Sequence, residues 1–233
     1  MPNHMPLTQR SATVPSKKLP RFNACLNDLP SAVTKALLKV GKLKQWRKGE
    51  VVVRQGQNSA EVVVGMQGRL AVDLAGPSGA DTLIRFLNEG ELVGIATALA
   101  GTPAPTSIVS NNASQTLHIE RNAFIQVLKD HPEGAIAVVV LLSHRLTELF
   151  RFIEMTSNRS LTERVRYALS RLAVRNGKVN DSGETVLDVT QADMAKAAGA
   201  SRQRVHLELQ RLQALGVISL GYGSITVLKL DAL

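Results

Sequence analysis

The stretch TQADMAKAAGASRQRVHLELQRLQALGVI, residues 190–218, decides how the C-terminal part of this chain folds. Thr190 is a natural helix N-cap, and Asp193 places a carboxylate in the positively polarised first turn. The helix that starts there ends at Gly199, and a second helix is predicted over residues 201–215. Two helices joined by so few residues cross steeply, so the stretch predicts a helix-turn-helix.

The close crossing of these helices restricts which residues can lie at the contact and in the turn. Ala195 is small enough for the contact, and Gly199 can take the positive φ that the turn requires. Helical spacing predicts that the buried faces carry Met194, Val205, Leu209 and Leu212.

The start of the second helix is left with polar side chains that suit a DNA groove. Arginine can donate two hydrogen bonds to a guanine edge and glutamine can pair with adenine, while Ser201 and the helix N-terminus can hold a phosphate. Residues 217–228, VISLGYGSITVL, predict two short strands that form a wing beside the helices. The alternative is a helical hairpin with a solvated basic face. The candidate DNA-binding residues are Thr190, Gln191, Ser201, Arg202, Gln203, Arg204 and His206.

Composition points the same way. The chain has 233 residues, a formal net charge of +9 and a pI near 10.1, which favours a polyanionic partner such as nucleic acid. Cys25 is the only cysteine, which excludes an internal disulfide and any all-cysteine iron–sulfur or zinc site, and fits the cytoplasm. The longest apolar run, residues 135–142, is far shorter than the roughly 20 residues of a membrane span, so no membrane partner is expected.

The middle of the chain changes from helical to strand periodicity. KGEVVVRQGQ (48–57), AEVVVGMQGRLAVDLAG (60–76) and DTLIRFLNEGEL (81–92) are β-branched runs broken by glycines. Short strands with glycine turns predict an antiparallel roll. The turn PSGAD (77–81) joins two of them, and the uncharged stretch 92–119 contributes strands at 106–109 and 115–119. The fold class is therefore α+β.

A long helix is predicted after the roll. Its apolar positions recur at alternating spacings of three and four, which is a short heptad seam. An ordinary core helix is the alternative, but this helix is apolar on more than one face, which favours a homodimer. The seam residues are Ile136, Val139, Ser143, Leu146, Phe150 and Ile153.

In order, these features resemble the CRP/FNR family of bacterial transcription regulators, related to the cyclic-AMP receptor protein, over roughly residues 22–233. The resemblance implies a β-roll effector domain, a homodimer through the long helix, recognition helices reading a two-fold symmetric operator, and RNA polymerase as a partner. Arg202 matches the family's main base-reading arginine. The chain departs from the family at Gln203, where relatives often have Glu, and at Leu207, where they often have a basic residue.

The expected organisation follows from these patterns and the resemblance. Residues 1–20 form a flexible N-terminal arm, 21–132 the β-roll effector domain, 133–156 the dimerisation helix and 157–233 the winged helix-turn-helix.

The resemblance also implies where an effector would bind. In relatives that bind cyclic nucleotides, a GEL-type turn supplies a glutamate for the ribose, and an Arg-Ser pair about ten residues later holds the phosphate. Here the second motif aligns near Pro105 and contains no arginine. Because a buried phosphate needs a charged partner, cyclic AMP is disfavoured, and a less charged small molecule or no effector is expected instead. A cyclic-nucleotide-dependent regulator with an atypical phosphate cradle stays open. The candidate pocket residues are Gly90, Glu91, Leu92, Thr106 and Ser107.

Other chemistries have weaker support. An iron–sulfur sensor needs several cysteines. Haem is conceivable through His118 or His131, although a lone histidine in a strand is more often structural. The five histidines show no HExxH-like pairing, and neither a phosphate-binding glycine loop nor a nucleophile elbow occurs, so no enzyme is predicted. A protein–protein module that uses the winged helix as a scaffold is a further alternative.

Overall fold

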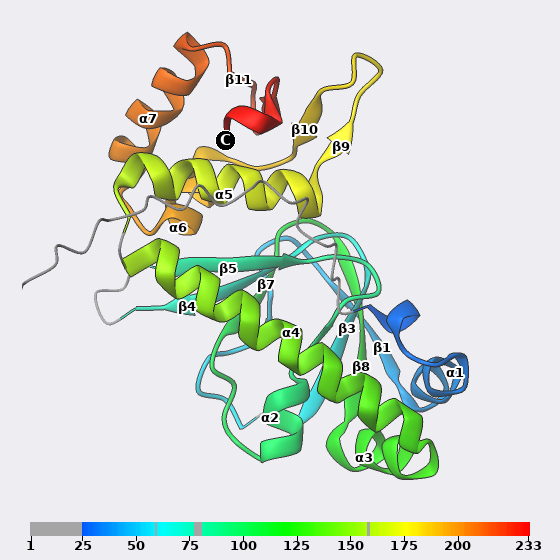
Figure 1. Ribbon diagram of the computed structural model, residues 1–233. Helices are drawn as coiled ribbons and strands as arrows, with labels where there is room; N and C mark the ends of the chain where they lie inside the picture. Colours follow the sequence, from blue (N-terminus) through cyan, green and yellow to red (C-terminus); the bar gives the residue numbers. More distant parts are fainter. Residues whose placement is uncertain (1–24, 59, 77–80, 158) are drawn as a thin grey trace, which may run out of the picture.

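The computed structural model describes residues 25–233 with the exception of 59, 77–80 and 158 (Figure 1). The predicted arm at residues 1–20 and most of the PSGAD turn lie outside the described residues.

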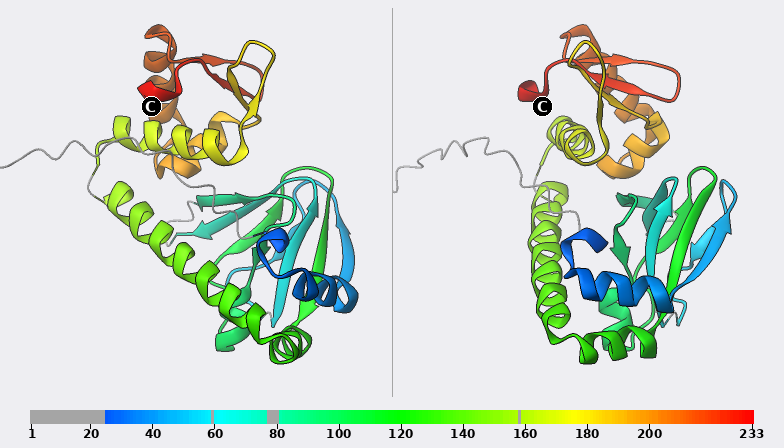
Figure 2. Two further views of the ribbon diagram at one scale, coloured as in Figure 1. Left: turned by 45° about the vertical axis from the view of Figure 1, so that its right-hand side comes forward. Right: turned by 90° about the vertical axis from the view of Figure 1, so that its right-hand side faces the viewer.

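The chain has the predicted α+β fold: an N-terminal β-roll, a long helix and a C-terminal helical domain with a small sheet (Figures 1 and 2). The elements of the first part are η1 (Leu26–Asp28), α1 (Ser31–Val40), β1 (Lys42–Trp46), β2 (Val51–Val53), β3 (Glu61–Gln67), β4 (Leu70–Ala75), β5 (Asp81–Leu87), β6 (Leu92–Val93), α2 (Ile95–Ala100), β7 (Ser107–Ser110), β8 (Ser114–Glu120) and α3 (Arg121–Asp130).

The roll consists of two antiparallel sheets. Within the described residues their strand orders are β1-β8-β3-β6 and β2-β7-β4-β5. Strands β7 and β8 lie where the uncharged stretch predicted them. The turn from β3 to β4 requires glycine, because Gly68 has φ +80° and a Cβ there would lie 2.5 Å from the carbonyl oxygen of Ala113.

The uncharged stretch also contains a helix that its composition does not predict. Helix α2 is six residues long and begins and ends beside glycines with positive φ, Gly94 (+84°) and Gly101 (+68°). So short a segment shows too few turns for helical periodicity to be recognised.

The long helix α4 (Pro132–Ser157) runs along the roll and leads to the C-terminal domain (Figure 1). Its inner face is buried at Val138, and at Gly134 a Cβ would lie 2.7 Å from the side chain of Val33. Its outer flank is uncovered in the right-hand view of Figure 2. None of the described helices is both long and apolar enough to cross a membrane.

The C-terminal domain packs against the roll. Its elements are α5 (Leu161–Asn176), β9 (Lys178–Val179), β10 (Thr185–Leu187), α6 (Gln191–Ala198), α7 (Arg202–Ala214), β11 (Ile218–Leu220), β12 (Ile225–Val227) and η2 (Leu230–Ala232). Its hydrophobic core extends into the roll through Ala71, Leu83 and Phe86.

Ion pairs reinforce this contact between the domains. The Nζ of Lys196 on α6 lies 2.8 Å from a carboxylate oxygen of Asp73 and 3.3 Å from one of Asp81, both on the roll. Arg69 of the roll pairs with Asp188 at 3.3 Å. The first helix of the helix-turn-helix is therefore fixed to strands β4 and β5.

Candidate DNA-binding surface and effector pocket

The turn between α6 and α7 has the geometry that the sequence predicts. The Thr190 hydroxyl accepts from the backbone N–H of Asp193, whose carboxylate accepts in return from the N–H of Thr190. Gly199 ends α6 with φ +58°, and its N–H donates to carbonyls of the last turn. These local interactions fix the direction in which α7 leaves α6.

The predicted division between buried and exposed faces is confirmed for most positions. Arg202, Gln203 and Arg204 at the start of α7 are exposed. Thr190 is exposed and Gln191 half-buried at the start of α6. The residues predicted to be buried are all at most 2% exposed: Met194, Val205, Leu209 and Leu212.

Two candidate DNA-binding side chains at the start of α7, Ser201 and His206, have features that the sequence does not indicate. Ser201 occupies the N-cap position, but its side chain makes no capping hydrogen bond, so its hydroxyl stays available to another acceptor or donor. His206 is half-buried rather than exposed, and its Nδ1 lies buried without a hydrogen-bond partner among the described residues.

The wing carries a feature that the sequence reasoning missed. Strands β11 and β12 pair antiparallel, and Gly221 and Ser224 close the hairpin through a backbone hydrogen bond of 3.0 Å. Tyr222 at the tip is fully exposed. An exposed aromatic flanked by glycines in a wing is a signal that could have marked it as a contact residue.

A cleft of about 880 Å³ separates this surface from the roll. From the C-terminal domain, Thr190, Gln191 and Arg202 line it, together with the wing. From the roll, it is lined by Lys48 and Arg69, and by the turn that contains Asn111 and Asn112. The structure thus brings part of the predicted DNA-binding set to the cleft.

The roll contains a small pocket of about 100 Å³ near the predicted effector site. Its lining residues include Thr106, together with Pro105, Gly94 and Thr97. Among the described lining residues Glu61 alone carries a charge, and neither Lys nor Arg occurs.

The other predicted pocket residues lie elsewhere. Gly90 packs near Cys25, Leu92 is buried in the core beneath α1 and α3, and the Ser107 hydroxyl accepts from the N–H of Gln55. The pocket wall comes instead from residues just after the GEL turn. Gly90, Leu92 and Ser107 are not among the residues that line this pocket.

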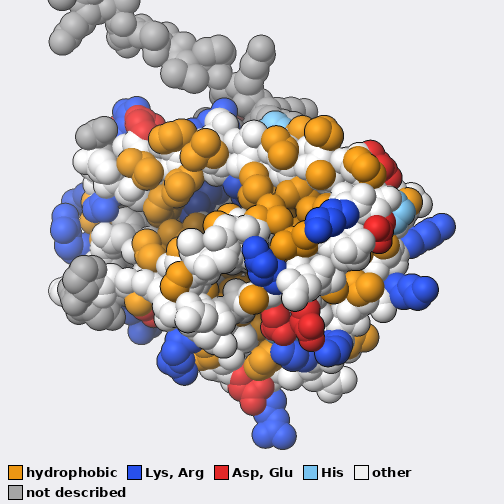
Figure 3. All heavy atoms as spheres, turned by 90° about the horizontal axis from the view of Figure 1, so that it is seen from below, with side chains coloured by type: hydrophobic (Ala, Val, Ile, Leu, Met, Phe, Trp, Pro, Cys, Tyr) orange, Lys and Arg blue, Asp and Glu red, His pale blue; other side chains and the backbone are white. Residues whose placement is uncertain are grey.

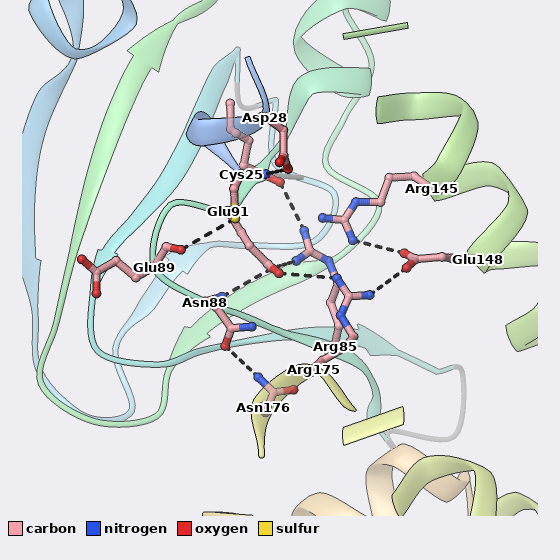
Figure 4. Close-up of polar contacts among 11 residues, drawn as sticks. Cys25, Asp28, Arg85, Asn88, Glu89, Glu91, Arg145, Glu148, Arg175 and Asn176 are labelled. Carbon is pink, nitrogen blue, oxygen red and sulfur yellow. Dashed lines mark hydrogen bonds and ion pairs between the residues drawn. The ribbon is translucent and has the colours of Figure 1, made fainter. Parts of the chain in front are cut away.

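Glu91 is also absent from the lining of this pocket, and its side chain lies in an ionic cluster (Figure 4). Its side chain is completely buried, with one carboxylate oxygen bonded to Arg85 and the other 3.4 Å from Nη2 of Arg175. Arg175 and Arg145 both pair with Glu148 of α4, at 3.0 and 3.3 Å. Glu91 thus joins the roll to α4 and α5, a role that its distance in sequence from Arg175 concealed.

His118 belongs to a structural network. Its Nδ1 lies 2.7 Å from a Glu61 carboxylate oxygen and its Nε2 lies 2.9 Å from the hydroxyl oxygen of Thr116. The indole N–H of Trp46 donates to that same hydroxyl oxygen. Burial lowers the pKa of His118, so the neutral ring is favoured. Because both ring nitrogens are engaged, haem ligation by His118 would require breaking this network.

Other potential reactive groups are similarly constrained. Burial, with the charge of Glu91 next in importance, raises the pKa of the Cys25 thiol to about 11, so the unreactive thiol form is favoured at neutral pH. The described residues contain no group of three or more His, Cys, Asp or Glu side chains that could hold a metal ion.

Comparisons with known proteins agree with this architecture. A family model described as cyclic nucleotide-binding domain matches residues 43–131, and one described as Crp-like helix-turn-helix domain matches residues 163–233. Together the two matches cover more than half of the chain. They correspond to the roll and to the C-terminal domain.

The curated proteins that are similar over most of this chain are named as a CRP-like regulator and a cyclic AMP receptor protein. The chain is 23% identical over 199 residues to the CRP-like cAMP-activated global transcriptional regulator of Mycobacterium tuberculosis, covering 85% of this chain and 88% of that protein. It is 25% identical over 180 residues to the cyclic AMP receptor protein of Thermus thermophilus, covering 77% and 81%. The c-di-GMP responsive global regulator CLP of Xanthomonas campestris has the same fold, with a TM-score of 0.74 and 17% identity over 85% of this chain and 99% of that one. With both domain models matched in order on either side of the long helix, the chain belongs to the CRP/FNR family of DNA-binding transcription regulators.

Proposed function

We propose that this protein is a homodimeric regulator that reads a two-fold symmetric DNA site through α7 and responds to an effector other than a cyclic nucleotide, or to none. The observation that carries the proposal is the exposed run Arg202, Gln203 and Arg204 on the first turn of a helix that α6 holds in a fixed direction. Family membership supports the cytoplasm as its location, RNA polymerase as a partner and a non-enzymatic role.

Binding to a duplex requires the C-terminal domain to move relative to the roll. Thr190, Gln191 and Arg202 face the cleft, and its 880 Å³ suit a small molecule but not a duplex. Exposed Tyr222 at the wing tip, and the Ser201 hydroxyl that α7 does not use, are suited to phosphate contacts.

Arg202→Ala is expected to lower discrimination at one base pair by about 1–3 kcal/mol, because a bidentate contact to guanine is lost. A duplex is first selected from a randomised library with the wild-type protein, and footprinting then compares affinities for single-base variants of it.

Arg54→Ala is the matched control. It removes the same charge from an exposed position on the roll, so we expect unchanged base preference and a wild-type salt dependence within experimental error. Unaltered sequence preference in Arg202→Ala would contradict the assignment. Binding indifferent to salt would instead argue that the winged helix does not bind DNA at all, because phosphate contacts release counterions.

The proposed dimer rests on the outer flank of α4. Ile136 and Phe150 are 67% and 63% exposed, and exposed apolar residues follow the heptad spacing between them. The hydroxyl of Ser143 in the seam donates to the Val139 carbonyl, and the hydroxyl of Thr147 beside the seam donates to the Ser143 carbonyl. Burial against a second copy would therefore leave neither of these two hydroxyls without a hydrogen-bond partner. The molecule viewed from below also shows hydrophobic side chains gathered around a hollow (Figure 3).

The effector proposal rests on the roll pocket. Its volume of about 100 Å³ is small, and Thr106 offers a hydroxyl where a cyclic phosphate would need a cation. Glu61 adds a negative charge to the wall, which disfavours an anion further.

Titration calorimetry with cyclic AMP and cyclic GMP is expected to give dissociation constants weaker than about 1 mM. The alternative, a nucleotide-dependent regulator with an atypical cradle, has support from the matched cyclic nucleotide-binding domain model and from the two relatives named for cyclic AMP. Micromolar binding that Thr106→Val weakens would establish that alternative.

A further inference from the structure

The exposed face of α7 carries a leucine at its centre. The residues that surround Leu207 at helical spacing are Gln203, Arg204, Gln210 and Arg211, and all four are exposed. Leu207 itself is 52% exposed, whereas the apolar residues of the opposite face, Val205, Leu209 and Leu212, are buried. Core packing therefore does not account for Leu207.

Two of the four exposed neighbours of Leu207, Gln203 and Gln210, carry side-chain amides, and one of the two arginines is paired within the protein. Arg211 donates to Glu208 at 2.7 Å, and Glu208 also accepts from Thr162 at 2.9 Å. Arg211 is thus held against the protein's own carboxylate. The side chains beside Leu207 that are available to contact DNA are then Gln203, Arg204 and Gln210.

An amide and an aliphatic side chain on adjacent turns match the major-groove edge of an A·T pair. Glutamine pairs with N6 and N7 of adenine, and the C5-methyl of thymine is the group that accepts apolar contact. A single apolar residue surrounded by polar ones offers little area for docking a protein, because interfaces need a contiguous apolar centre.

We propose that Leu207 is a specificity-determining residue that packs against the 5-methyl group of a thymine in the bound DNA. This inference rests on the proposed function, since it requires α7 to lie in the major groove. Leu207 then selects for thymine by removing its methyl group from water, without a hydrogen bond.

The test removes that methyl group from the DNA. Wild-type protein selects a duplex from a randomised library, and each thymine of the selected half-site is replaced in turn by deoxyuridine. At one position the wild type should lose about fourfold in affinity, from roughly 0.8 kcal/mol per buried methyl-sized group. Replacing that thymine in both half-sites should cost about 15-fold if the two contributions add.

The protein variants complete the cycle. Leu207→Ala should bind the thymine and deoxyuridine duplexes equally at that position. Leu215→Ala is the matched control, because Leu215 is an equally accessible leucine (63% exposed) that follows the last residue of α7, and it should keep the wild-type sensitivity. If deoxyuridine affects wild type and Leu207→Ala alike, or affects neither, the role of Leu207 is wrong while sequence-specific binding stands. If no sequence is enriched from the library, the proposed function and the role of Leu207 both fall.

Discussion

Leu146→Glu is expected to convert the protein from a dimer into a monomer and to weaken binding to its two-half-site duplex by about 10²–10⁴-fold. Leu146 lies in the middle of the outer seam of α4 and is 53% exposed in the single chain. In a parallel two-stranded helix pair equivalent seam positions face each other, so the substitution places two carboxylates together in an apolar contact. A monomer loses the effective concentration that links the two recognition helices. Light scattering after size exclusion gives the mass, and titration of the duplex gives the affinity.

Leu43→Glu provides the matched control for that experiment. Leu43 on β1 is 58% exposed, so the substitution adds the same charge to an equally accessible leucine outside the seam. We expect it to leave both the mass and the DNA affinity unchanged. A Leu146→Glu protein that stays dimeric would show that the uncovered flank of α4 has another use.

The helix-turn-helix was predictable because its determinants are local. Thr190, Asp193 and Gly199 act through hydrogen bonds and backbone angles within one or two turns of themselves. The buried positions follow from helical periodicity alone. The docking of α6 on β4 and β5 through Lys196 was not predictable, because Asp73 lies 123 residues away in sequence.

The effector site shows where a motif misleads. The GEL turn follows β5, but a turn motif does not determine whether the side chain of its glutamate lies toward the pocket or toward another part of the protein. Glu91 has two arginine partners: Arg85, six residues away on β5, and Arg175, on a helix of another domain. The prediction that no arginine lies near Pro105 rests on the alignment of the sequence with the family motif; in the structure Pro105 and Thr106 line the pocket.

Glu91→Gln is expected to lower the free energy of unfolding by about 3–5 kcal/mol, because it leaves buried guanidinium groups without their counter-charge. Burial, with repulsion from Arg145 next in importance, lowers the pKa of Arg85 to about 9. Keeping Arg85 charged in this buried place costs free energy, and the negative charge of Glu91 offsets that cost. Urea unfolding measures the effect, with Trp46 fluorescence reporting on the roll and circular dichroism on the whole chain.

Two further variants test whether Glu91→Gln acts by leaving buried charges unbalanced or only by removing contacts. Glu120→Gln breaks a pair with Lys42 in which both side chains are mostly exposed, and such pairs contribute at most about 1 kcal/mol. Replacing Glu91 and Arg85 together by Leu and Met should recover much of the stability, since a buried pair exchanged for apolar side chains is often neutral. Arg175 keeps Glu148 as a partner in that double variant. If Glu91→Gln is as mild as Glu120→Gln, the cluster does not hold the roll to α5, and the docked arrangement depends on Phe86 and the Lys196 ion pairs instead.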